Sequence, residues 1–181
     1  MRVVSAIALS LVLPGLVHAD NKPLTIKVGK LSATAPSGWT SEKPSNRLRS
    51  YQIKLAGEKG GPGDGELIVM PESDPKAEKV FPRWKTQFVP PDGKSVDDIS
   101  KASKLDGVKG ATINILNVNG NWRYKERPFD PRSKEVIKEN YRVVWVIVND
   151  GDEATHIRLS GPKATIDHHY PAFEKWLRSL K

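Results

Sequence analysis

The stretch of sequence that decides the fold is residues 141–148, YRVVWVIV. Successive side chains of a β-strand point to opposite faces, so one face carries Val143, Trp145 and Ile147. The other face carries three valines at the alternate positions. An antiparallel strand that is apolar on both faces lies at the centre of a sheet that is covered on both sides. Residues 141–148 therefore predict a sheet with one layer above it and another below.

Turn signals on both sides of this strand predict that the sheet is antiparallel. Two Asp-Gly pairs, Asp106-Gly107 and Asp150-Gly151, each stand between strand-like stretches, and glycine readily adopts the positive φ of tight hairpin turns. The stretches are 99–105 and 108–118 around the first pair, and 141–148 and 154–160 around the second. A third pair, Asn119-Gly120, fits either a hairpin turn or a bulge within one long strand.

Further strands and two covering helices are expected elsewhere. Alternation predicts strands at 24–28 and 49–55, and residues 66–70 form another, which Pro71 is expected to end. A first helix face is expected from apolar residues at four-residue spacing: Val80, Trp84 and Phe88. Pro82 places its expected start near Lys79 or Phe81, because proline is tolerated in the first helical turn. A second helix is expected in the C-terminal segment, where Pro171 predicts a kink or a division into two pieces.

The composition and the first residues limit the class of protein. The chain has 181 residues, 29 Lys+Arg against 21 Asp+Glu, a net charge of +8, and no cysteine. Disulfide scaffolds, thiol catalysis and Cys-ligated metals are therefore excluded. Residues 1–19 combine Arg2, a short apolar run and Val17-His18-Ala19, which predicts a signal peptide rather than a transmembrane segment. We expect residues 20–181 to form a single domain that is exported to the periplasm or the medium.

A series of short motifs runs through residues 31–181. It comprises Pro36-Ser37-Gly38-Trp39, Arg49, Gly63-Asp64 with Glu66, Arg83-Trp84 with Gln87-Phe88, Asp92-Gly93, Ser160-Gly161-Pro162, Phe173 and Ser179-Leu180. In this order the motifs resemble small exported bacterial proteins of unknown function, a group similar to the Mog1/PsbP-like superfamily; Phe81-Pro82 departs from that pattern. The resemblance implies an α+β fold, an α/β/α sandwich with a central antiparallel sheet. It also implies a non-enzymatic role, since members bind other macromolecules as accessory factors of a photosynthetic complex or as a partner of a small GTPase.

The residue pattern predicts no catalytic, metal or cofactor site. His168 and His169 are adjacent on the expected second helix and lack the i, i+4 spacing of a metal pair. His156 lies in a strand, and no Gly-x-Ser-x-Gly motif supplies a nucleophile for it. The acidic segment from Asp150 fails the EF-hand pattern, which needs Gly at its sixth position and Glu at its twelfth, because Thr155 and Gly161 stand there. We therefore expect catalytic residues, metals and cofactors to be absent.

The candidate binding residues are basic and aromatic side chains that alternate in the sequence. Trp122, Arg123, Tyr124 and Arg127 lead into a charged segment, 128–140, which we expect to be a loop. Arginine pairs with carboxylate or phosphate and aromatic rings stack, so this segment could bind a protein or an anionic polymer. Two further arginines, Arg49 and Arg83, join the candidate set if folding brings them close. The alternative is a strand edge whose charges prevent pairing with another chain.

The sequence thus predicts an exported, non-enzymatic binding or accessory protein that acts through a basic, aromatic-containing surface. The alternative is a small-molecule-binding or hydrolytic pocket in the same fold, which would need a deep apolar cleft with a few convergent polar groups. Net positive charge by itself favours non-specific association, so no specific nucleic acid partner is expected.

Overall fold

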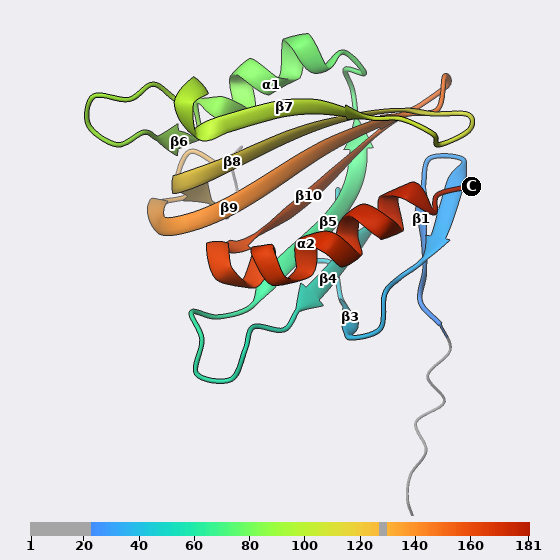
Figure 1. Cartoon of the computed structure of the whole chain (residues 1–181), viewed down its shortest axis with the longest axis horizontal. Helices are drawn as coiled ribbons and strands as arrows, with labels where there is room; N and C mark the ends of the chain where they lie inside the picture. Colours follow the sequence, from blue (N-terminus) through green and yellow to red (C-terminus); the bar gives the residue numbers. More distant parts are fainter. Residues whose placement is uncertain (1–22, 127–129) are drawn as a thin grey trace, which may run out of the picture.

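The structure, a computed structural model, describes residues 23–126 and 130–181 (Figure 1). The predicted signal peptide, residues 1–19, and the candidate residue Arg127 lie outside these described residues. The elements in chain order are β1 (Thr25–Val28), β2 (Leu31–Thr34), β3 (Trp39–Glu42), β4 (Tyr51–Leu55), β5 (Gly65–Glu72), α1 (Ala77–Lys85), β6 (Phe88–Val89), the 3-10 turn η1 (Asp97–Ile99), β7 (Ser100–Leu105), β8 (Thr112–Lys125), β9 (Glu135–Asn149), β10 (Ala154–Pro162) and α2 (Lys163–Arg178).

The central sheet is antiparallel, and in the described part of the chain it has eight strands. Its order is β3-β4-β5-β10-β9-β8-β6, with β7 also paired to β8, while β1 and β2 form a separate hairpin. The strand β9 lies between β10 and β8, and its residues 143–148 are at most 1% exposed. The prediction that this stretch is a central strand, flanked by hairpins at both Asp-Gly pairs, is confirmed.

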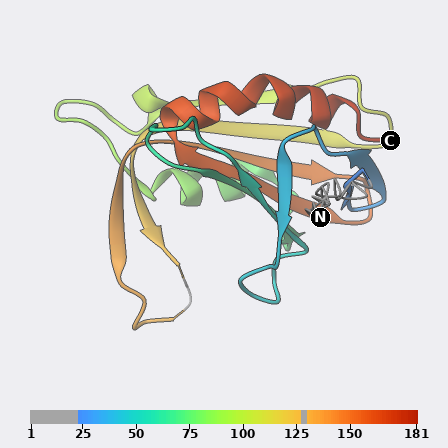
Figure 2. The same ribbon diagram turned by 90° about the horizontal axis from the view of Figure 1, so that it is seen from below.

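Two helices cover the two faces of the sheet, as Figure 2 shows from below. The helix α2 packs Ile166, Phe173 and Trp176 onto a core that includes Val144, Val146 and Val148 of β9, together with the β1–β2 hairpin. On the opposite face, Trp84 of α1 stacks on Trp145 of β9 at 5.6 Å between ring centroids. The predicted α/β/α sandwich is confirmed, and the double-sided apolar pattern of β9 is its physical cause.

Two predicted proline effects differ from the structure, and the predicted division of the second helix at Pro171 is wrong. The helix α1 begins at Ala77, before Lys79, so Pro82 lies inside it, and α2 runs through Pro171 as one element. The strand β5 continues through Pro71 to Glu72. Since β4 pairs with β5 only as far as Val69, Pro71 has a strand partner on one side, and its missing N–H need not interrupt a ladder.

A bulge re-aims the far end of the β8–β9 pair. Between the pairs Gly120–Tyr141 and Trp122–Lys138, Asn121 of β8 lies opposite two residues of β9, so the bulge is on β9. The Asn119-Gly120 pair lies within the long strand β8, beside this bulge, and does not form a hairpin turn. Within the bulge, Asn140 adopts a positive φ of 52°, and its N–H donates to Asn121 Oδ1 at 3.3 Å. The expected loop at 128–140 is wrong for residues 135–140, which are strand. These residues lack the alternation of apolar and polar side chains that marks a half-buried strand, and side chains on both faces are exposed, which hides the strand from a burial-based prediction.

Candidate binding surface on the β8–β9 hairpin

Beyond the bulge, β8 and β9 form a two-stranded ribbon that extends away from the sheet (Figure 2). We call residues 122–125 of β8 and 135–138 of β9 the outer hairpin. Its strands pair with each other, and β6 adds one pair at the base, between Phe88 and Trp122. A ribbon with so little support from neighbouring strands is held chiefly by its base.

The outer hairpin has two different faces. Trp122, Tyr124, Val136 and Lys138 lie on the face that α1 covers at its base, because Trp122 is packed in the same cluster as Trp84. We call this the α1-side face. The other face carries Arg123, Lys125, Glu135 and Ile137, in which Arg123 lies opposite Ile137 and Lys125 opposite Glu135. The sequence neighbours Trp122, Arg123 and Tyr124 therefore do not form one surface, since Arg123 is exposed on the opposite face.

The Trp122 side chain fixes the base of the outer hairpin. It is 3% exposed, and its indole Nε1 donates a hydrogen bond to Gln87 Oε1 at 3.2 Å. Its ring centroid lies 5.0 Å from that of Tyr124 and 6.1 Å from that of Tyr141. A side chain this buried anchors the ribbon and offers a partner almost no contact area, whereas Tyr124 is half-buried and lines the surface.

Behind Trp122 lies a compact group that we call the arginine cluster: Arg49, Glu66 and Arg158. Arg49 Nη1 donates to Glu66 Oε1 at 2.8 Å, and Arg158 Nη2 donates to Glu66 Oε2 at 3.0 Å. The Arg158 guanidinium also lies over the Trp122 ring, 5.1 Å from its centroid. Burial lowers the pKa of Arg158, and the Glu66 carboxylate acts in the opposite direction. Two guanidinium groups on one carboxylate leave a net positive charge beneath the hairpin.

The arginine cluster joins two of the predicted residues through two that sequence reasoning missed. Arg49 comes from the end of a loop and Trp122 from β8, and the structure connects them through Glu66 of β5 and Arg158 of β10. A signal for it was Arg158 itself, a charged residue between Ile157 and Leu159 of β10. By contrast, Arg83 is exposed on α1, about 100° around the helix from its buried neighbour Trp84.

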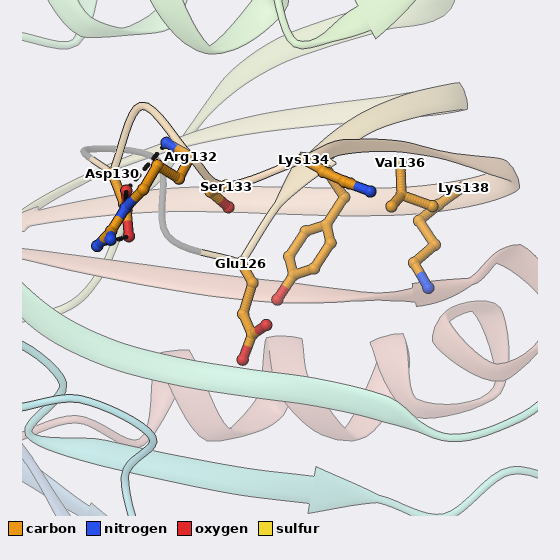
Figure 3. Close-up of a pocket in the computed structure, with 8 residues that line it drawn as sticks. Glu126, Asp130, Arg132, Ser133, Lys134, Val136 and Lys138 are labelled. Atoms are coloured by element: carbon orange, nitrogen blue, oxygen red, sulfur yellow. Dashed lines mark hydrogen bonds and ion pairs between the residues drawn. The ribbon is translucent and has the colours of Figure 1, made fainter.

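An open concavity of about 630 Å³ adjoins the α1-side face (Figure 3). Its lining residues are Tyr124, Glu126, Asp130, Arg132, Ser133, Lys134, Val136 and Lys138. Arg132 is held by Asp130, with 3.2 Å between Nε and Oδ1. Lys138 Nζ lies 5.9 Å from the centroid of the Tyr124 ring. Neither Lys134 nor Lys138 forms an ion pair with any residue that the structure describes, so both ammonium groups can meet an external anion.

The histidines occupy packing or surface positions. His156 is buried and stacks on Trp84 at 4.5 Å, and burial lowers its pKa to about 3, so its ring is neutral near pH 7. His168 is exposed on α2, and His169 Nε2 lies 2.9 Å from the carbonyl oxygen of Ala56. Across residues 23–126 and 130–181, no three His, Asp or Glu side chains gather in a way that could hold a metal. In the same ranges no helix is long and apolar enough to span a membrane.

Solved structures that resemble this chain include two distant likenesses. A Pseudomonas aeruginosa protein of unknown function, PA94, has 14% sequence identity and a TM-score of 0.44, with 88% of this chain and 96% of that chain covered. Cyanobacterial PsbP (CyanoP) from Synechocystis sp. PCC 6803 has 12% identity and a TM-score of 0.45, with 94% of this chain and 98% of that chain covered. No protein-family model and no curated protein matches the sequence.

Proposed function

We propose that this is an exported, non-enzymatic accessory protein that captures an acidic segment of a partner protein on the α1-side face of the outer hairpin. The observation that carries the proposal is the arrangement of Lys134 and Lys138 around Val136 and Tyr124. The two lysines have no acidic partner among the described residues, and the apolar side chain between them is 49% exposed. Export rests on the sequence of residues 1–19.

The contributions to such binding differ in kind. Exposed ion pairs contribute about 0.2–1 kcal/mol each, so Lys134 and Lys138 would select for acidic partners and accelerate their encounter. Most of the affinity would come from covering Tyr124 and Val136, because aromatic and apolar anchors dominate interfaces. The positive charge of the arginine cluster lies behind the same face and adds to its potential.

The lining of the concavity favours this proposal over a small-molecule pocket in the same fold. Seven of its eight lining residues, Tyr124 included, are charged or carry a hydroxyl group. The eighth, Val136, is aliphatic. Pockets for small organic ligands are mostly apolar and enclose the ligand, whereas this concavity is open along the hairpin.

The test compares two charge-reversal variants that change the net charge equally. Lys134→Glu with Lys138→Glu alters the α1-side face, and Lys101→Glu with Lys104→Glu alters exposed positions on β7. Binding of a fluorescent poly-glutamate peptide would be followed by anisotropy at about 0.05 and about 0.5 M salt. We expect the hairpin variant to bind at least about tenfold more weakly, the β7 variant to bind like the wild type, and salt to weaken wild-type binding. Equal effects of the two variants, or no wild-type binding, would refute the proposal.

A further inference from the structure

Part of one side of β9 has no strand beside it in the described part of the chain. The strand β10 pairs with β9 from Asn149 back to Tyr141 and ends at Pro162, where the chain enters α2. Residues 135–140 of β9 are paired with β8 or lie at the bulge, and their other side has no partner among residues 23–126 and 130–181. We call this side of residues 135–140 the free edge.

The backbone groups that point toward the free edge follow from one hydrogen bond. The N–H of Arg123 donates to the carbonyl of Gln87 at 2.7 Å, on the side of β8 that faces away from β9. In an antiparallel pair, a residue whose N–H points outward lies opposite one whose N–H and C=O also point outward. Arg123 lies opposite Ile137, so the N–H and C=O of Ile137 point to the free edge, and alternation places those of Glu135 there as well.

The charges on this edge oppose pairing with a second copy of the chain. In two copies of β9 related by a two-fold axis, residues opposite each other must lie on the same face of the sheet, so they are an even number of positions apart in the sequence. Each possible register is therefore centred on one residue, which lies opposite its own copy. Centring on Val136 places Lys134 opposite Lys138, and centring on Ile137 places Glu135 opposite Glu139. Centring on Glu135 or Lys138 places that residue opposite itself. Like charges face each other in all four registers, and such pairs are destabilising.

A complementary strand meets no such obstacle. We infer that the free edge of β9 accepts an extended acidic segment of a different protein as an added antiparallel strand. Acidic residues of that segment would face Lys134 and Lys138, and an apolar residue would face Val136 between them. The residue opposite Ile137 would exchange both backbone hydrogen bonds with it. This inference rests on the proposed function and specifies how the acidic partner is held.

The probe is a synthetic peptide built to this pattern, Thr-Glu-Ile-Val-Thr-Glu, whose glutamates fall opposite Lys138 and Lys134 in the antiparallel register. A control peptide, Thr-Glu-Ile-Val-Glu-Thr, has the same composition, but its glutamates lie three residues apart and face opposite sides of a strand. We expect the control peptide to bind several-fold more weakly, because only one of its glutamates can meet a lysine. Equal affinities of the two peptides would contradict the alternating pattern.

Two substitutions at one position test the added strand itself. Ile137→Pro removes the outward N–H without removing a β8–β9 hydrogen bond, and Ile137→Val keeps that N–H. We expect Ile137→Pro to weaken peptide binding at least about tenfold and Ile137→Val to change it by less than about threefold. If Ile137→Pro binds like the wild type while Lys134→Glu with Lys138→Glu does not, strand addition is wrong and the acidic-capture proposal stands. If the wild type binds neither this peptide nor poly-glutamate, both are wrong.

Amide hydrogen exchange on the wild type provides a readout that does not depend on the folding of a variant. Bound peptide should slow exchange at the amides of Glu135 and Ile137, which point to the free edge. The amides of Val136 and Lys138 already face β8 and should change less. Exchange that slows equally at all four positions, or at none, would overturn strand addition.

Discussion

Removing the charge of Glu66 is expected to destabilise the whole domain, because this carboxylate is the shared partner of two buried arginines. Arg49 and Arg158 have side chains that are 6% and 14% exposed, and each donates to a different oxygen of Glu66. In Glu66→Gln one guanidinium would face an amide N–H₂ group, and the other would keep a neutral acceptor. A charge-assisted hydrogen bond contributes about 1.5–3 kcal/mol, and an unpaired buried charge costs more.

The exposure of Glu66 reduces this effect. Its side chain is 29% exposed, so water screens part of the lost interaction, and we expect a loss of about 2–4 kcal/mol in the free energy of unfolding. In a domain of this size, about 3 kcal/mol corresponds to a fall in Tm of about 6–12 °C. Urea denaturation near pH 7, followed by tryptophan fluorescence, would measure the change.

The matched control is Glu174→Gln, which removes the same charge from the exposed ion pair with Arg178 on α2. We expect this variant to lose less than about 1 kcal/mol, because exposed ion pairs contribute little. If Glu66→Gln costs no more than Glu174→Gln, the arginine cluster is not a stabilising unit and the reasoning from burial fails.

Three further substitutions test the packing around the sheet. Burial holds the pKa of His156 at about 3 against an ordinary 6.5, so the unfolded chain takes up a proton that the folded chain does not, and stability should fall as the pH drops from about 6.5 toward about 3. His156→Phe, which keeps the ring on Trp84, should flatten that dependence in urea titrations at several pH values. Trp84→Ala should cost about 3–5 kcal/mol by the same measurement, as expected for an aromatic removed from a core. Gly161→Ala would place a Cβ 2.8 Å from the Cα of Gly65 in the neighbouring strand, and should cost about 1–3 kcal/mol; a neutral result would show that β5 and β10 can separate there.

The parts of the fold that the sequence predicts are those set by local patterns. The double-sided apolar run of β9 and the two Asp-Gly turns are contained in short windows, and they determine the sheet and its layers. The proline positions were less informative, because a proline inside a helix or strand is tolerated where the surrounding packing compensates.

The candidate site depends on contacts that no short window contains. Glu66 and Arg158 are 92 residues apart in sequence, and their pairing with Arg49 arises only when β5 and β10 become neighbours. Likewise, Trp122 and Arg123 are adjacent in sequence, yet one is buried and the other exposed, because a strand separates them onto opposite faces. The basic and aromatic composition indicated the segment, and the geometry of the ribbon selects Tyr124, Lys134 and Lys138 within it.

The bulge at Glu139 and Asn140 of β9 has an evolutionary consequence for the ribbon beyond it. The register of the sheet is set before this point, and the outer hairpin pairs almost entirely with itself. Insertions of two residues in each strand would lengthen the ribbon while keeping every side chain on its original face, and the core would be unchanged. The reach of the hairpin can therefore drift among descendants of this chain by whole ladder repeats, and an engineer could exchange its tip for another recognition sequence while leaving the sandwich as the scaffold.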